Sequence, residues 1–364
     1  MSGPVIIGGG PAGTAAAITL ARAGHAVTLI ERSVDASDKV CGDFLSAEAL
    51  AMVEGFGVDL SAASTISAVR LVHRNRSVTT HLPFAARGLS RRALDAALLE
   101  RAQAGGATIL RGHRVSAVEQ DRGAILLSCG SLGQIAAKTV FLATGKHEMR
   151  GAGRIGHGTG LVGMKMYYAL AGSQLQALRY HVELILLAGG YAGFQVVEAD
   201  RAVLCVLLPA ARLRAVGGRW DRLLDALTDE SPHLRTRLAG ARGLLDQPLA
   251  VAGLPYGYVY TSNRRDPPGL LRLGDQAVVI ASLTGDGVAL ALGSGSLAAR
   301  MWLAGGGAHY HDHLATRLSR QMRVASAIHR LCLNPALQPW VAAICGLWPG
   351  AIRLAAAATR ALEV

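Results

Sequence analysis

Three glycines and one acid near the N-terminus have the spacing of a phosphate-binding turn. Gly8, Gly10 and Gly13 follow the apolar run Val5–Ile7, and Glu31 lies eighteen residues after Gly13. Such glycines permit a tight turn and close approach of a pyrophosphate, while the following helix start supplies unpaired N–H groups and Glu31 can accept from ribose hydroxyls. The pattern predicts that an ADP-containing dinucleotide binds here.

A second glycine motif lies far along the chain. Gly274-Asp275 follows the apolar run Leu270–Leu273, and Thr284–Gly287 opens an apolar helix. A helix start with two glycines can approach a planar ring closely, and its dipole would stabilise negative charge on that ring, as in a reduced flavin anion. A capped core helix would have the same sequence, but the pairing with the N-terminal motif favours a flavin dinucleotide.

The elements that must position these motifs follow from the apolar patterns. Strand Val5–Ile7, helix Thr14–Ala23 and strand Ala26–Ile30 form a βαβ unit in order. The later pattern predicts antiparallel strands and hence a second domain. The remaining expected elements are helices 89–104, 287–303 and beyond 309, and strands 108–110, 115–118, 124–127, 139–142, 180–187, 193–197, 202–208 and 270–273.

Composition limits the function classes. The chain has 364 residues, a hydrophobic fraction of 51% and a net charge of +12, and 33 of its 37 basic residues are arginine. So apolar a chain is not disordered. The basic residues are scattered without interleaved aromatics, so no nucleic-acid partner is expected. Five cysteines without a CxxC pair favour a reducing cytoplasm, and no apolar run of eighteen residues predicts a spanning helix.

The motifs occur in a familiar order. The Gly8–Gly13 turn with Glu31-Arg32, the segment Arg91–Asp95, Gly274-Asp275 and Thr284–Gly287 resemble FAD-dependent oxidoreductases of the para-hydroxybenzoate hydroxylase fold. Lys39–Ser46 is similar to the Lys-x-Cys-Gly stretch of the branch with geranylgeranyl reductases, flavin monooxygenases and flavin halogenases. The resemblance covers about residues 1–300 and implies an α/β fold: a discontinuous Rossmann-like FAD-binding domain, a mixed or antiparallel β-sheet substrate domain and C-terminal helices.

The resemblance also implies roles for residues. Glu31 would hold the adenosine ribose, Arg91 would lie near the phosphates or ribityl chain, Asp275 would bond the ribityl hydroxyls, and the Gly285–Gly287 amides would face the flavin pyrimidine edge. Cys41 would be a proton donor or reactive thiol near the flavin, or else a packing residue. The full expected set for FAD is Gly8, Gly10, Pro11, Ala12, Gly13, Glu31, Arg32, Cys41, Gly42, Arg91, Val115, Ala143, Thr144, Gly145, Gly274, Asp275, Gly285, Asp286, Gly287 and Val288.

The leading interpretation is an FAD-dependent monooxygenase that hydroxylates a hydrophobic, lipid-like or aromatic substrate through a flavin C4a-hydroperoxide. The alternatives are an ene-reductase of the geranylgeranyl reductase type, with Cys41 nearby, and a non-catalytic, membrane-docked electron-transfer protein. Thr144 stands where many hydroxylases carry an acid, so NAD(P)H and an external reductant both stay open as the electron source. The Trp-x-Trp-x-Ile-Pro motif is absent, which disfavours tryptophan-type halogenation.

The substrate end is marked by aromatic residues. Tyr191, Phe194, Tyr256 and Tyr258 are expected to face the flavin in an apolar pocket, although a core sheet would have similar residues. His309 and His313 have helical spacing for a metal but lack a third ligand, so no metal is expected.

The expected division of the chain is a FAD-binding domain from residues 1–68, 88–160 and 268–305, a substrate domain from 69–87 and 161–267, and a helical segment 306–364. The expected partners are a small hydrophobic substrate and a flavin reductase or other electron donor. The expected location is the cytoplasm. Peripheral membrane association through the apolar C-terminal helices stays open beside simple core packing.

Overall fold

The N-terminal glycine turn follows the central strand of a five-stranded parallel sheet. The computed structural model describes residues 3–154, 158–262 and 266–360. The parallel ladder follows from short runs that are apolar on both faces, because both faces are covered. In spatial order its strands are β17 (Leu270–Arg272), β10 (Val140–Leu142), β1 (Val5–Ile7), β2 (Thr28–Glu31) and β6 (Thr108–Arg111).

The two faces of this sheet have different covers. Ile6 packs with helices α1 (Pro11–Arg22), α3 (Arg91–Ala104) and α8 (Gly287–Leu303) in one core cluster. Its neighbour Val5 faces the other side, since successive strand residues alternate, and packs with an antiparallel meander. The meander consists of β7 (Ala117–Asp121), β8 (Ala124–Cys129) and β9 (Gly133–Ala137). The predicted βαβ unit is confirmed, with its helix beginning at Pro11.

A nine-stranded sheet forms the second half of the molecule. Its apolar inner face packs against four short helices, α4 (Gly172–Leu178), α5 (Ala210–Ala215), α6 (Trp220–Glu230) and α7 (Pro232–Arg237). The sheet is mixed, because β12 and β4 run parallel while its other pairs are antiparallel. Its order is β15 (Arg242–Gly243), β11 (Leu161–Ala169), β14 (Ala202–Pro209), β13 (Gly190–Val196), β12 (Tyr180–Leu187), β4 (Ser64–His73), β5 (Arg76–Gly88) and β3 (Phe44–Leu45), with β16 (Leu249–Ala252) on β11.

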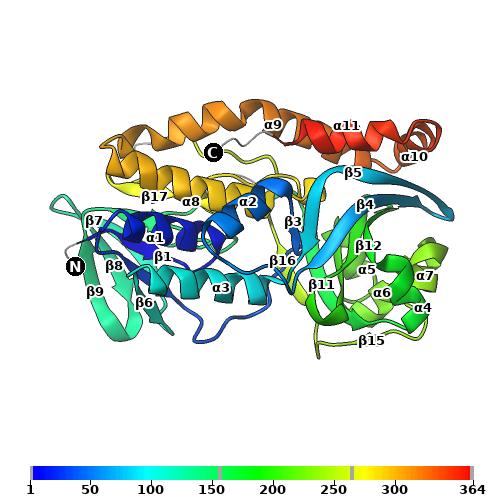
Figure 1. The fold of residues 1–364 in the computed structure, drawn as a ribbon, viewed down its shortest axis with the longest axis horizontal. Coiled ribbons are helices and arrows are strands. Elements are labelled where there is room, and N and C mark those ends of the chain that lie inside the picture. Colours follow the sequence, from blue (N-terminus) through cyan, green and yellow to red (C-terminus); the bar gives the residue numbers. More distant parts are fainter. Residues whose placement is uncertain (1–2, 155–157, 263–265, 361–364) are drawn as a thin grey trace.

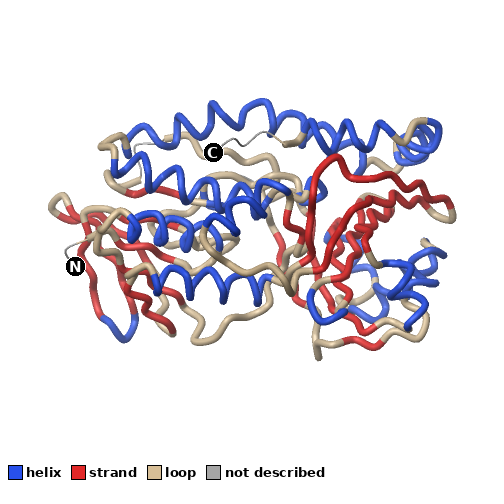
Figure 2. The backbone as a smooth tube through the Cα atoms, viewed as in Figure 1, coloured by secondary structure: helices blue, strands red, loops and turns tan. Residues whose placement is uncertain are grey.

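C-terminal helices form a layer along one side of both halves (Figure 1). The long helix α9 (Tyr310–Leu333) lies above α8, and α10 (Gln338–Leu347) and α11 (Gly350–Ala358) lie beside β5, while α2 (Ala47–Gly55) packs on α8. Figure 2 separates this helical layer from the strands. Short 3-10 turns occur at Gly130–Leu132, Glu198–Asp200, Gly274–Gln276, Ser282–Thr284 and Gly307–His309.

Over the described ranges, no single helix is long and apolar enough to cross a membrane. The one combination there that passes by length and composition is α10 with α11, which are bent by 111°.

Candidate active site

The N-terminal turn leaves the start of α1 open to a groove. Gly10 caps α1 without any side-chain cap, and the Gly9 N–H donates to Glu31 Oε2 at 2.7 Å. Gly8 has φ +106°, and a Cβ there would lie 2.4 Å from the carbonyl oxygen of Ala143. A Cβ at Gly13 would lie 2.0 Å from the Gly8 oxygen, so the turn requires glycine at both positions.

This groove continues past the start of α8. One stretch is lined by Gly8, Gly10, Glu31, Arg32, Arg91, Val115, Ala143, Thr144, Gly145 and Asp275. The next stretch is lined by Gly10, Pro11, Ala12, Cys41, Gly42, Arg91, Ala143, Gly145, Gly274, Asp275, Gly285, Gly287 and Val288. The predicted cofactor residues from distant parts of the chain are thus brought to one continuous groove.

The donors along this groove fit an extended dinucleotide. The N-termini of α1 and α8 both open onto it, and neither has a side chain capping its first amides. Gly285, just before α8, has φ +74°, and a Cβ there would lie 2.7 Å from the Phe44 ring. Two positive helix ends with a flat glycine surface between them suit a pyrophosphate and an electron-rich ring.

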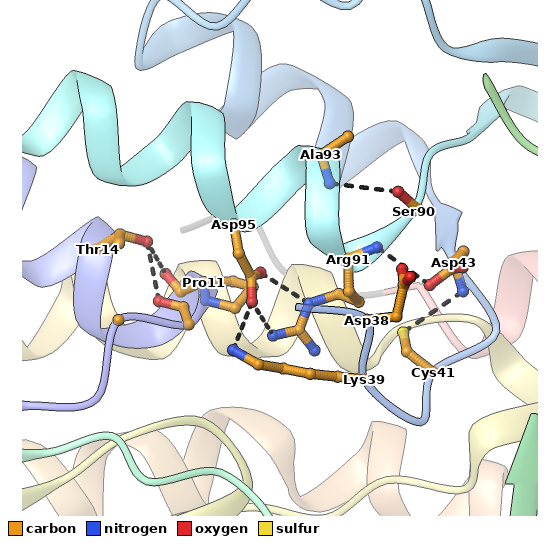
Figure 3. Close-up of polar contacts among 12 residues, drawn as sticks. Pro11, Thr14, Asp38, Lys39, Cys41, Asp43, Ser90, Arg91, Ala93 and Asp95 are labelled. Carbon is orange, nitrogen blue, oxygen red and sulfur yellow. Dashed lines mark hydrogen bonds and ion pairs between the residues drawn. The ribbon is translucent and has the colours of Figure 1, made fainter. Parts of the chain in front are cut away.

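Arg91 is held against the glycine turn by a carboxylate. Its guanidinium forms a bidentate pair with Asp95, at 2.8 and 2.9 Å, and Lys39 Nζ lies 2.8 Å from the same carboxylate (Figure 3). A Cβ at Gly10 would lie 3.3 Å from Arg91 Nη2. The pair therefore fixes a cation at the α1 start, where a phosphate would bind.

Cys41 lies on a loop between the groove and a second cavity. The thiol is half-buried, and its sulfur accepts from the Asp43 N–H at 3.5 Å (Figure 3). Asp43 is fully buried and has φ +55°, an unusual conformation for a non-glycine residue. Its Oδ2 accepts from Lys165 Nζ at 2.6 Å and from the Tyr167 hydroxyl at 2.5 Å. Burial raises the pKa of Asp43, and the Lys165 ammonium opposes that shift.

Further bonds fix the loop of residues 39–43 from both sheets. Lys165 also donates to the Lys39 oxygen at 3.0 Å, and Lys146 donates to the Val40 oxygen at 2.5 Å. Gln195 from β13 donates to the Asp43 oxygen at 2.9 Å. A left-handed residue held by this many buried partners is over-determined by its surroundings, which is typical of a functional position.

The second cavity has a volume of about 240 Å3 and an apolar wall. It shares Cys41, Gly42, Phe44, Lys146, Tyr256, Ser282 and Gly285 with the groove, so the two spaces meet at the Cys41 loop. The nine-stranded sheet supplies one wall through Leu71, Tyr191, Gln195 and Leu207, and the C-terminal helices supply the opposite wall through Ile328, Val341, Ile352 and Ala355. An apolar wall of this kind suits a hydrocarbon group.

A few polar atoms lie in this apolar wall or on residues packed against it. The Ser282 hydroxyl donates to the Tyr256 hydroxyl at 2.7 Å. The Tyr191 hydroxyl and both ring nitrogens of His329 are buried without a hydrogen-bond partner among the described residues. His329 packs against the Tyr191 and Tyr256 rings, with centroids 6.3 and 5.3 Å away, and burial lowers its pKa to about 4, so it is neutral. Unsatisfied buried polar atoms are costly unless a ligand meets them.

Three predicted residues lie elsewhere. Phe194 is fully buried on the opposite face of β13, in the core under α4–α7, because it is three positions from Tyr191 and strand residues alternate. Tyr258 does not line the cavity either. The Asp286 side chain turns away from the groove and pairs with Arg360, which also donates to the Thr284 oxygen at 2.9 Å. Its burial raises the Asp286 pKa to about 7.

Several residues at the site were missed by the sequence analysis. Asp43, Lys146, Lys165 and Gln195 come from four separate segments, and only the fold brings them together. One signal was available: three of the four lysines in this arginine-rich chain hold the Cys41 loop. Over the described ranges, no group of three or more His, Cys, Asp or Glu residues has metal-binding geometry.

The fold and this groove define an FAD-dependent oxidoreductase, and FAD is its cofactor. Residues 4–192 match the model of the pyridine nucleotide-disulphide oxidoreductase family, and the chain belongs to that family. The fold resemblance inferred from the motifs is thereby confirmed.

Among similar proteins is menaquinone reductase of Mycobacterium tuberculosis, 28% identical over 356 residues that cover 92% of this chain and 85% of the relative. A solved flavin-dependent brominase superposes with a TM-score of 0.78 at 16% identity, over 97% of this chain and 92% of that chain. A geranylgeranyl bacteriochlorophyll reductase-like protein of Thermoplasma acidophilum gives 0.73 at 17% identity, over 91% and 87%. At these identities the two structures establish the fold alone.

Proposed function

We propose that this enzyme is a reductase that adds two hydrogens across a carbon–carbon double bond in the isoprenoid chain of a lipid such as a prenylated quinone. The observation that carries the proposal is the apolar cavity that meets the cofactor groove at Cys41. The relatives named menaquinone reductase support a quinone-bearing lipid as the substrate class.

The cofactor-binding assignments are part of this proposal. Glu31 and the α1 amides would hold the ADP half, with Arg91 near the phosphates. The α8 amides at Gly287 and Val288 would face the ring. The open amides at the starts of α1 and α8 support these assignments, since no side chain among the described residues caps either helix.

When bound and reduced, FAD supplies a hydride to one carbon of the double bond. The chain's own residues must then supply a proton to the other carbon and exclude water. Cys41 and Tyr256 are the candidates, because both line the groove and the cavity and both carry an ionisable hydrogen. The Tyr256 hydroxyl accepts from Ser282, so its own proton is free to point elsewhere.

The cavity would hold the chain by burial of hydrocarbon, which contributes about 25 cal/mol for each Å2 removed from water. Tyr191, with its unsatisfied hydroxyl, would donate to an oxygen of the polar head group. The same apolar pocket could hold a substrate for hydroxylation, the leading interpretation from sequence, so the experiment must separate the two reactions.

The test uses the purified FAD-loaded protein. It is reduced with dithionite without oxygen, mixed with a menaquinone, extracted, exposed to air and examined by mass spectrometry. We expect a product with two added hydrogens in its chain. The air step returns any quinol to quinone, so simple reduction of the head group leaves no change. A quinone without a chain is the control.

Two results would oppose the proposal. Reduced enzyme that is mixed with menaquinone and oxygen and yields a product with one added oxygen atom would favour hydroxylation instead. Reduced enzyme that is reoxidised equally by the chainless quinone, with no saturated chain, would indicate that the cavity does not present the chain to the cofactor. Adding NADPH or NADH in place of dithionite identifies the electron source in the same assay.

A further inference from the structure

The C-terminal helices carry most of the exposed large apolar side chains of the molecule. Ten such side chains are exposed over the described ranges, and seven lie between residues 331 and 354. Leu347 is 89% exposed and Trp340 is 70% exposed. Four of the seven lie in α10 and α11, two flank α10, and Leu331 lies near the end of α9. We call this set the α10–α11 face: Leu331, Leu337, Trp340, Ile344, Leu347, Trp348 and Leu354.

Its concentration within 24 consecutive residues, from the end of α9 to α11, distinguishes this face from scattered surface apolar residues, which are normal. The helices lie at one end of the top layer in Figure 1, beside the far end of the β4–β5 hairpin. Leu347 also lines a surface hollow with Arg74 and Arg76 of that hairpin, and both arginines are exposed.

The segment that carries the face has charged residues of a single sign. Residues 313–362 contain six arginines and no aspartate or glutamate. Arg330 and Arg353 are exposed within the same segment as the face. An apolar helix surface flanked by arginine suits the interface of a bilayer that contains anionic lipids. There, burial of the apolar side chains and attraction between arginine and the lipid head groups both contribute to binding. A second copy of this chain would instead bring two basic faces together.

The opposite side of the same two helices lines the apolar cavity. Val341 and Cys345 of α10 and Ile352 and Ala355 of α11 form its wall. One pair of helices therefore separates the exposed apolar face from the cavity that meets the cofactor groove.

We propose that the α10–α11 face docks on the surface of a membrane containing anionic lipids, and that the lipid substrate enters the cavity beside these two helices. Entry of the substrate beside these helices rests on the proposed function. Membrane docking does not, because it needs only the exposed side chains and the arginines.

The experiment is vesicle flotation with the full-length FAD-loaded protein and no substrate. We expect binding to vesicles of phosphatidylcholine with phosphatidylglycerol, weaker binding to phosphatidylcholine alone, and a decline with added salt. The double variant Trp340→Ser/Leu347→Ser should bind about tenfold or more weakly, since apolar burial drives insertion. The matched control is Val34→Ser/Leu132→Ser, two exposed apolar residues elsewhere.

Two charge-reversal variants give a second test with a smaller expected effect. Arg353→Glu should weaken binding to the anionic vesicles, whereas Arg242→Glu on β15, with the same change in charge, should have little effect. Bound FAD and the unfolding temperature of each variant verify the fold.

The proposal is overturned if the wild-type protein does not bind anionic vesicles, or if the Trp340→Ser/Leu347→Ser variant binds as well as the control. It is also overturned if the wild type is a dimer in vesicle-free solution and this variant is a monomer, because the face would then join two copies. Reductase activity on detergent-dispersed lipid should be unchanged in this variant. Failure of that activity in the wild type would count against the proposed function and leave docking in place.

Discussion

At the residue scale, the rare lysines define the most constrained part of the site. Lys146 and Lys165 donate to the loop that carries Cys41, and Lys39, at the start of that loop, donates to Asp95 on α3. The Lys165 ammonium is fully buried and has two oxygen acceptors, on Asp43 and Lys39, which suit a compact point charge with three donors. The contacts of Lys165 therefore account for a lysine at this position inside the apolar strand β11.

Lys165→Met should destabilise the protein strongly, because it leaves the Asp43 carboxylate buried without its cation. Removing one partner of a buried ion pair costs about 3–5 kcal/mol. We expect a lower unfolding temperature and weaker retention of FAD. The double variant Asp43→Asn/Lys165→Met should recover part of the loss, which thermal unfolding followed by intrinsic fluorescence can measure. If the double variant is no better than the single one, the pair does not hold the loop as described.

Tyr191→Phe tests the polar end of the cavity. The hydroxyl has no partner among the described residues, so its removal should not destabilise the fold. If it donates to the substrate head group, the KM for a prenylated quinone rises about three- to tenfold, as expected for one hydrogen bond, while kcat is little changed. A prenyl alcohol that lacks the quinone should respond less. An unchanged KM for both substrates would remove Tyr191 from the binding site.

At the element scale, one side of α11 lines the cavity and another side is exposed to solvent. Ala355 lines the cavity, whereas Ala357 on the same helix is exposed. Ala355→Trp should fill the cavity and abolish turnover of detergent-dispersed lipid, with FAD still bound, because the cofactor groove lies elsewhere. Ala357→Trp makes the same substitution toward solvent and should retain activity. Steady-state rates with flavin absorbance distinguish these outcomes, and equal loss in both variants would contradict the placement of α11.

The stability of the Asp286–Arg360 pair, which joins the start of α8 to the chain just after α11, should depend on pH. Burial raises the pKa of Asp286 from its ordinary value of 3.8 to about 7, so the folded protein keeps a proton that the unfolded chain releases. This contribution to stability is fully present below the unfolded-state pKa and is lost as the pH rises toward 7. We expect Asp286→Asn to reduce that fall in unfolding temperature between about pH 4 and pH 7, measured by calorimetry. Parallel pH profiles for the two proteins would contradict the assignment.

The sequence predicted the elements whose hydrophobic periodicity or flanking residues mark their ends clearly. Val5–Ile7, Tyr180–Leu187 and Gly287–Leu303 have the boundaries that the sequence predicted. The position of Phe194 was wrong although the alternation of strand β13 could have excluded it beside Tyr191. The wall contributed by α10 and α11 was not predictable, because which side of an apolar helix meets a cavity depends on what packs against it.

At the scale of the whole molecule, the two halves meet at the Cys41 loop. Arg91 and Lys146 reach it from the side of the five-stranded sheet, and Lys165, Tyr167 and Gln195 reach it from the nine-stranded sheet. The domain boundaries expected from sequence stay a prediction. Even if the chain is divided into these domains, the two halves need not be stable independently, because both contribute to the buried hydrogen-bond network around the Cys41 loop.

This sharing predicts that FAD stabilises the entire molecule in a single transition. A ligand present at about 100 times its Kd adds about 2.7 kcal/mol to the folded state, and a shared network transmits that gain to both sheets. Flavin release and the fluorescence of Trp302 on α8 and Trp348 beside α11 should therefore change at one temperature, which rises as free FAD is added. Calorimetry should give one peak. Two peaks, of which only one moves with FAD, would mean that the halves unfold separately and that the loop contacts are too weak to couple them.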